Sequence, residues 1–230
     1  MTINPIYFLI LIPALLAWFA QARVRKVYEN NEAKLNRQQV NGLEAARRLL
    51  SFHYLKDVSV ETVPGKLSDH YDPATKTMRL SNEVATSRSI TSLGIVAHEV
   101  GHAVQDAEGY HFMRLRTSMA NRISVAAQWS SFIFLGGILF RIPVLMVLAG
   151  VFMFGMLLFT LVTLPVERDA SKRALKSLEQ TGLVAGDEAK GVRQVLNSAA
   201  FTYLASLGQR LASFLFFAVV ILLARGVPQQ

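Results

Sequence analysis

Uncharged, strongly apolar stretches alternate with charged segments along this chain of 230 residues. The apolar stretches cover residues 1–22, 125–140, 142–164 and 211–224. A helix needs about 20 apolar residues to cross the hydrocarbon core of a bilayer. The third stretch meets this length by itself, the first two meet it with their uncharged flanks, and the fourth needs residues 205–207 or the tail. The pattern therefore predicts an integral membrane protein with four transmembrane helices.

The first apolar stretch is typical of a retained anchor rather than of a cleaved signal peptide. No Lys or Arg precedes it, whereas Arg23, Arg25 and Lys26 follow it directly. A signal peptide carries its positive charges before the apolar segment. We therefore expect an anchor whose N-terminus lies outside the cell.

The net charge of +8 follows the same topology. Of the 24 Lys and Arg residues, 15 lie within residues 23–122 and 7 within residues 168–210. Positively charged segments of membrane proteins face the cytoplasm, so four crossings place both segments inside and the turn at Arg141 outside. The basic excess then indicates attraction to anionic lipid headgroups rather than binding of nucleic acid. The absence of Cys excludes disulfides and thiolate metal ligands.

These patterns predict a mainly α integral membrane protein with a cytoplasmic domain that contains a small β-sheet. The membrane segments are an anchor at residues 1–22, a hairpin of two helices at 124–165, and a fourth helix with a short tail at 207–230. The cytoplasmic segments are residues 23–123 and 166–206.

Within the first cytoplasmic segment, residues 43–54 repeat apolar side chains at helical spacing, which predicts an amphipathic helix. Alternation over residues 58–63, ended by Pro64-Gly65, predicts a strand. A turn at Asp72-Pro73 leads to a second strand at 77–81. A helix from about residue 92 follows, and two further helices are expected in the second cytoplasmic segment.

The sequence VAHEVGHAVQ, residues 96–105, contains two histidines separated by one helical turn. His98 and His102 therefore lie on one helix face and can bind one metal ion. A zinc ion with three protein ligands keeps a position open for water, and Glu99 can take a proton from that water. This spacing describes hydrolysis of a peptide bond, and Gly101 indicates that another segment approaches closely. A surface helix with incidental histidines is the alternative, disfavoured by the apolar neighbours.

The chain resembles the YugP-type neutral zinc metallopeptidases, a family of small membrane-embedded proteases. The motifs that carry the resemblance occur in the expected order: GLEAARRLL, LSDHYDP, MRLS, VAHEVGHAVQ, LPVERDAS and VLNSAAFTYLA. The resemblance implies a gluzincin-like site in which His98 and His102 bind Zn²⁺. Glu99 is then the general base, and Glu167 of LPVERDAS is the third metal ligand.

The predicted topology also favours Glu167. Two crossings separate His102 from Pro165, so the chain returns to the same side of the membrane. Proline suits the first turn of a helix, so a new helix is expected at Pro165 with Glu167 in its first turn. The alternative is that Glu167 only interacts with the positive end of that helix.

The sequence allows two interpretations for each of several polar residues. Tyr203 either donates a hydrogen bond to the oxyanion of the tetrahedral intermediate or packs at an interface. His70 and Tyr71 either line the cleft or belong to a structural turn. Asp169 either orients a ligating histidine or is an acid at a helix start.

The remaining candidates concern the surface and the sheet. His53 is expected on a helix face, and His111 at the surface or the lipid interface. Proteases of this type often bind substrate as an added strand, and strand 77–81 is a candidate for the receiving edge.

We therefore expect a zinc-dependent endopeptidase of the cell membrane that acts at the cytoplasmic face. Its expected partners are protein or peptide substrates at the membrane, the lipid bilayer, and a membrane-protein partner or second copy of the chain, without nucleic acid. The main alternative is a non-proteolytic assembly or scaffold protein with a structural zinc site. A small transporter is disfavoured because few charges lie within the predicted spans.

Overall fold

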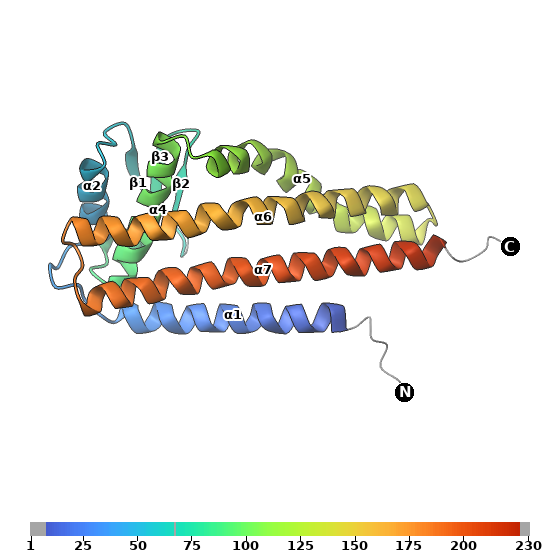
Figure 1. Ribbon diagram of the computed structural model, residues 1–230, viewed down its shortest axis with the longest axis horizontal. Coiled ribbons are helices and arrows are strands. Elements are labelled where there is room, and N and C mark those ends of the chain that lie inside the picture. The colour runs from blue at the N-terminus through green and yellow to red at the C-terminus, as the bar shows by residue number, and fades with distance from the viewer. Residues whose placement is uncertain (1–7, 67, 226–230) are drawn as a thin grey trace. The chain divides into compact units, whose positions relative to one another are not determined.

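The computed structural model describes residues 8–66 and 68–225, which are mainly helical with one small sheet (Figure 1). This part of the expected fold class is confirmed. In chain order the elements are α1 (Phe8–Glu32), α2 (Gly42–Phe52), β1 (Ser59–Val63), β2 (His70–Asp72), β3 (Thr77–Ser81), α3 (Asn82–Thr86), α4 (Ile90–Ala107), α5 (His111–Leu139), α6 (Pro143–Gln180) and α7 (Asp187–Arg225).

The chain forms two compact units, each built from separate segments. The helical unit contains the segment that ends at Ala20, Leu115–Leu164, and the segment that begins at Thr202. The mixed unit contains Gln21–Arg114 and Pro165–Phe201. Helices α6 and α7 each contribute residues to both units.

The sheet of the mixed unit has the strand order β1-β3-β2. Strand β1 pairs parallel to β3, and β2 pairs antiparallel to β3. The predicted strand at 77–81 is therefore confirmed, but its expected role as a receiving edge is wrong. Both sides of β3 are already hydrogen-bonded, so only β1 and β2 are edge strands.

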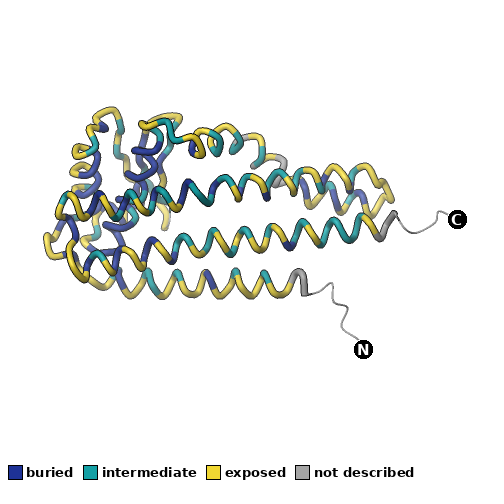
Figure 2. Tube along the Cα trace, in the orientation of Figure 1, coloured by how far each residue is buried: buried dark blue, intermediate teal, exposed yellow. Residues whose placement is uncertain are grey.

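Helix α4 forms the centre of the mixed-unit core. It begins at Ile90 because the Ser89 hydroxyl accepts a hydrogen bond from the Ser92 amide at 3.0 Å, which caps an otherwise unpaired donor. Its apolar residues are almost fully buried, among them Leu93 and Val96, and Figure 2 shows the buried positions concentrated along this helix. Burial of this kind is the main favourable contribution to folding.

Gly101 allows α4 to approach α6 closely. A Cβ atom at this position would lie 2.6 Å from the carbonyl oxygen of Ala170 and 3.1 Å from its Cα atom. Backbone atoms cannot yield as a flexible side chain can, so only glycine permits this separation. The close approach indicated by the sequence at Gly101 is confirmed.

Two helices of the described residues are candidate membrane spans, and the apolar part of each belongs to the helical unit. They are Pro143–Gln180 and Asp187–Leu222, whose most apolar windows have mean hydropathy values of 2.6 and 1.8. The second predicted span is represented by the shorter apolar helix Trp129–Leu139, and part of the first lies outside the described residues. The structure therefore supports two spanning helices, and the expected number of four stays a prediction.

The expected new helix at Pro165 is wrong. Pro165 lies inside α6, which runs without a break from Pro143 to Gln180. Proline removes one backbone hydrogen bond, but long membrane helices tolerate this loss when their surroundings compensate for it. Glu167 is therefore an interior residue of a long helix, and not a residue of a first turn.

We predict that Gly101→Ala lowers the free energy of unfolding by about 1–3 kcal/mol, because the added methyl group forces α4 and α6 apart. Thermal unfolding of the purified protein measures the change. Gly94→Ala in the same helix is the matched control, because its Cβ atom would meet Val195 at an ordinary 3.6 Å. Equal stabilities of the two variants would contradict the proposed constraint.

Candidate metal centre

Two histidines from α4 and one glutamate from α6 meet inside the mixed unit. One ligand atom from each of His98, His102 and Glu167 lies within 4.8 Å of the others. Glu167 Oε2 is 3.0 Å from His98 Nε2 and 3.6 Å from His102 Nε2. The structure thus brings together the three residues that the sequence analysis named as ligands.

This donor set fits zinc. Zinc in catalytic sites is commonly bound by three protein ligands drawn from His and carboxylate, with metal–ligand distances of about 2.0–2.2 Å. The side chains of Glu167 and His102 are almost fully buried, and His98 is partly exposed. A group of two imidazoles and one carboxylate with one accessible side can therefore hold a metal ion and leave a position for water.

The buried position of Glu167 has an electrostatic consequence. Burial by itself raises the pKa of this carboxyl, but the hydrogen bonds and charges of His102 and His98 act in the opposite direction and prevail. The pKa of Glu167 is therefore held below its ordinary value, and the carboxylate is ionised.

Gln105 holds the ring of His102 in place. Its Oε1 atom lies 3.0 Å from His102 Nδ1, and its Nε2 donates to the Val166 carbonyl and to Asp169 Oδ2, each at 2.8 Å. Gln105 is fully buried. The amide thus directs His102 Nε2 towards Glu167, and it connects α4 to the backbone of α6.

Asp169 belongs to the same hydrogen-bond network through Gln105. It contacts Gln105 rather than His102, and it accepts a hydrogen bond of 2.5 Å from Arg173 Nε. Arg173 also donates to Glu108 at 2.7 Å. The expectation that Asp169 orients a ligating histidine therefore applies only through Gln105. Sequence analysis missed Gln105, although its position one turn after His102 on the same helix is a usable signal.

Ser171 contacts the ring of His98 as Gln105 contacts the ring of His102. Its hydroxyl oxygen lies 3.3 Å from His98 Nδ1. Both metal-facing nitrogens are therefore Nε2 atoms, with the opposite ring nitrogens occupied by polar partners. Such partners fix the ring orientation of metal-binding histidines.

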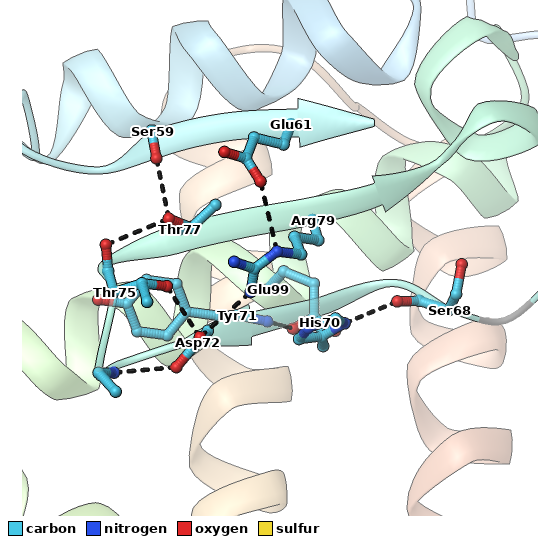
Figure 3. A network of polar contacts seen from close by, with 11 residues as sticks. Ser59, Glu61, Ser68, His70, Tyr71, Asp72, Thr75, Thr77, Arg79 and Glu99 are labelled. Atoms are coloured by element: carbon cyan, nitrogen blue, oxygen red, sulfur yellow. Dashed lines mark hydrogen bonds and ion pairs between the residues drawn. The ribbon is translucent and has the colours of Figure 1, made fainter. Parts of the chain in front are cut away.

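Edge strand β2 holds the carboxylate of Glu99. The Tyr71 amide donates to Glu99 Oε2 at 2.8 Å (Figure 3). The Tyr71 hydroxyl donates to Asp106 Oδ2 at 2.9 Å, so both ends of this residue are attached to α4. Glu99 is buried and lies outside the group of three ligands. Its carboxylate is therefore positioned by a backbone group rather than by the metal-binding residues.

The LSDHYDP motif combines the two interpretations left open by the sequence. Asp72 accepts hydrogen bonds from the Ala74 amide and the Thr75 hydroxyl, which forms the turn before β3. Tyr71 connects the same motif to Glu99. His70 is exposed, and its Nδ1 lies 2.7 Å from the Ser68 carbonyl. The motif thus forms strand β2 and the start of the turn that follows it, and through Tyr71 it contacts Glu99.

The other candidate residues lie elsewhere. Tyr203 is half-buried on α7 in the helical unit, and its role at the oxyanion stays a prediction. His53 ends α2 with its Nε2 2.7 Å from the Ser177 hydroxyl. His111 is exposed at the start of α5.

Comparisons with known proteins identify the family of this chain. A family model described as "Putative neutral zinc metallopeptidase" matches residues 6–223, so the chain belongs to this family of zinc metallopeptidases. The chain is 37% identical over 210 residues to the "Putative membrane protease YugP" of Bacillus subtilis (strain 168), covering 91% of this chain and 93% of that protein. No solved structure matches. The family resemblance drawn from the motifs is confirmed.

We predict that Gln105→Leu weakens zinc binding by about 10–100-fold, the usual effect of removing a group that orients a metal ligand. Competition with a chromogenic chelator measures the affinity. Glu108→Gln, at the exposed end of the same network, is the control and should bind zinc as the wild type does. If Gln105→Leu also keeps wild-type affinity, His102 does not depend on this contact.

Proposed function

We propose that this protein is a membrane-bound zinc endopeptidase that hydrolyses peptide bonds of membrane or membrane-proximal proteins at the cytoplasmic face. The observation that carries the proposal is the convergence of His98 and His102 with Glu167 beside a separately held carboxylate, Glu99. The family supports zinc as the metal, and the relative from Bacillus subtilis is named as a membrane protease.

In the proposed mechanism, His98, His102 and Glu167 would hold zinc, which would supply an acidified water and a Lewis acid for the scissile carbonyl. Glu99 accepts the proton of the attacking water on its carboxylate. It then passes this proton to the nitrogen of the leaving amine, as general acid–base catalysis requires. The Tyr71 amide limits the movement of Glu99 between these two steps.

Stabilisation of the oxyanion is assigned to Tyr203 as a proposal. Its phenolic hydroxyl is the kind of donor that stabilises a developing negative charge on a tetrahedral intermediate. The VLNSAAFTYLA motif, one of those that carry the family resemblance, contains this tyrosine.

We assign substrate binding to the outer edge of β2. This strand pairs with β3 on one side only, and its middle residue contacts Glu99. A substrate segment that adds to this edge as a strand would be held by backbone groups other than the Tyr71 amide, which already donates to Glu99. It would then pass directly beside the proposed general base.

A structural zinc site in an assembly protein is the second candidate function. Structural zinc sites are usually closed by four protein ligands. The group found here offers three, and Glu99 is held by Tyr71 outside the group. These two observations favour the peptidase.

For the membrane topology we propose four crossings. Support comes from the two long apolar helices α6 and α7 and from the concentration of Lys and Arg in the mixed unit. The positive-inside rule then places the mixed unit in the cytoplasm.

We predict that Glu99→Gln keeps about stoichiometric zinc and lowers peptide hydrolysis by at least about 100-fold, because a neutral amide cannot accept the proton of the water. Glu167→Ala should lose both zinc and activity, because one of three ligands is missing. Metal analysis of the purified variants, paired with cleavage of a casein-type substrate, measures both properties. Full activity of Glu99→Gln would exclude the proposed mechanism, and retained zinc in Glu167→Ala would exclude the ligand.

We also predict the sidedness of three positions. The native chain has no Cys, so single cysteines placed at Lys66, Lys190 and Arg141 can be labelled without background. In intact cells a membrane-impermeant maleimide should label only the cysteine at position 141, because the others face the cytoplasm. All three should react after permeabilisation, and labelling at position 66 in intact cells would overturn the topology.

A further inference from the structure

Arg210 lies on α7 where the proposed topology requires the helix to be inside the bilayer. The uncharged stretch Leu211–Ala224 has 14 residues, which gives a length of only about 21 Å at about 1.5 Å per residue. The hydrocarbon core is about 30 Å thick. The candidate span must therefore include residues before Leu211, so Arg210 falls within it.

The helical unit offers this arginine no acidic partner. Its segments, residues 1–20, 115–164 and 202–230, contain no Asp or Glu. Within the described residues, the guanidinium of Arg210 makes a polar contact with Met156 Sδ, at 3.7 Å from Nη1. A thioether is a weak acceptor, and it carries no charge. A cation at this depth without a counter-ion is costly and usually marks a functional site.

Arg210 lines a polar cavity that lies wholly within the helical unit. The cavity has a volume of about 300 Å³. Besides two methionines of α6, it is lined by polar side chains from α5 and α7: Ser130, Ser131, Ser206, Gln209, Arg210 and Ser213. Four hydroxyls, one amide and one guanidinium thus line a single cavity that is open to the surface of an otherwise apolar bundle. Their shared property is the capacity to donate hydrogen bonds.

We propose that this cavity binds the headgroup of an anionic phospholipid, with Arg210 paired to the phosphate and the hydroxyls donating to its oxygens. The proposal rests on the membrane placement proposed for the helical unit and does not depend on peptidase activity. Guanidinium and phosphate form strong, charge-assisted hydrogen bonds. The lipid thereby supplies the negative charge that the unit lacks.

The depth of Arg210 agrees with a lipid of the cytoplasmic leaflet. Helix α7 ends at Arg225, which is 15 residues after Arg210 and therefore about 22 Å further along the helix axis. If Arg225 marks the outer boundary of a hydrocarbon core about 30 Å thick, the Cα atom of Arg210 lies about 8 Å from the cytoplasmic boundary. Side chains on a helix lean towards its N-terminus, and the N-terminal end of α7 is the cytoplasmic end in the proposed topology. The guanidinium therefore extends towards the phosphate level. The serines that lie deeper in the bilayer than Arg210 can donate hydrogen bonds to the ester carbonyl groups of the same lipid.

Native mass spectrometry of the full chain in detergent tests this proposal. We expect the wild type to keep one phosphatidylglycerol molecule, and Arg210→Gln to lower its occupancy by about tenfold, the effect of losing a charge-assisted contact. Arg210→Lys should bind more strongly than Arg210→Gln, because it keeps the charge. Arg141→Gln is the matched control, because it removes the same charge from an exposed turn and should bind as the wild type does.

Competing ligands identify the source of the phosphate. Diacylglycerol with the same acyl chains should not replace phosphatidylglycerol, and millimolar inorganic phosphate should not displace it. Equal binding of diacylglycerol, displacement by inorganic phosphate, or equal losses in Arg141→Gln would each overturn the proposal.

Unchanged lipid binding in Arg210→Gln would also overturn the proposal. The guanidinium would then be expected to pair with an acidic side chain on a membrane helix of another protein. If Arg210→Gln does not fold, Ser213→Ala should lower the occupancy by a smaller factor. Binding should persist in Glu99→Gln, so a failed peptidase assignment and a failed lipid assignment are distinguishable.

Discussion

The close contact between Gly101 of α4 and Ala170 of α6 is the constraint on which the candidate metal site depends. Glu167 can meet two imidazoles only if the two helix backbones approach to a distance that excludes any Cβ atom at position 101. The same approach allows Gln105 to bond the Val166 carbonyl. Because Gly101 directly precedes His102, the glycine and the ligand it serves belong to one turn of one helix.

The polar groups around the site have distinct tasks. Gln105 contacts Nδ1 of His102, and Ser171 contacts Nδ1 of His98. Both imidazole rings are therefore oriented before any metal binds. Tyr71 holds Glu99 from the sheet side. A buried polar network stabilises a single arrangement only when all of its members are satisfied, and the described buried side-chain atoms of this protein all have partners. Ligands and proposed base are therefore held by separate elements that meet at α4.

Two long helices contribute residues to both units. Glu167 and the apolar residues that precede Pro165 belong to α6, and α7 likewise contributes to the mixed unit and to the helical unit. The candidate metal ligand Glu167 is thus part of the same helix as a candidate membrane span.

Local sequence patterns were sufficient to predict several features of this protein. The HExxH spacing predicted that His98 and His102 lie together as candidate ligands, because residues one helical turn apart share a face. Alternation predicted β1 and β3, and the order of motifs predicted the family, which the comparisons confirm. Apolar stretches of sufficient length predicted the two candidate spans. Each of these features depends on neighbours in sequence, so the sequence alone determines it.

Contacts between distant segments were decided only by the tertiary structure. Strand order made β3 central and left β2 at the edge beside Glu99, which no local pattern could indicate. Helix α6 continues through Pro165 despite one missing backbone hydrogen bond, which the local sequence did not predict. Gln105 gained its role because Val166 and Asp169 lie opposite it. Arg210 lines one cavity with Ser130 of α5 and Met156 of α6, which lie far from it in the sequence. Residues far apart in sequence create these environments together, and their effect appears only when the chain is folded.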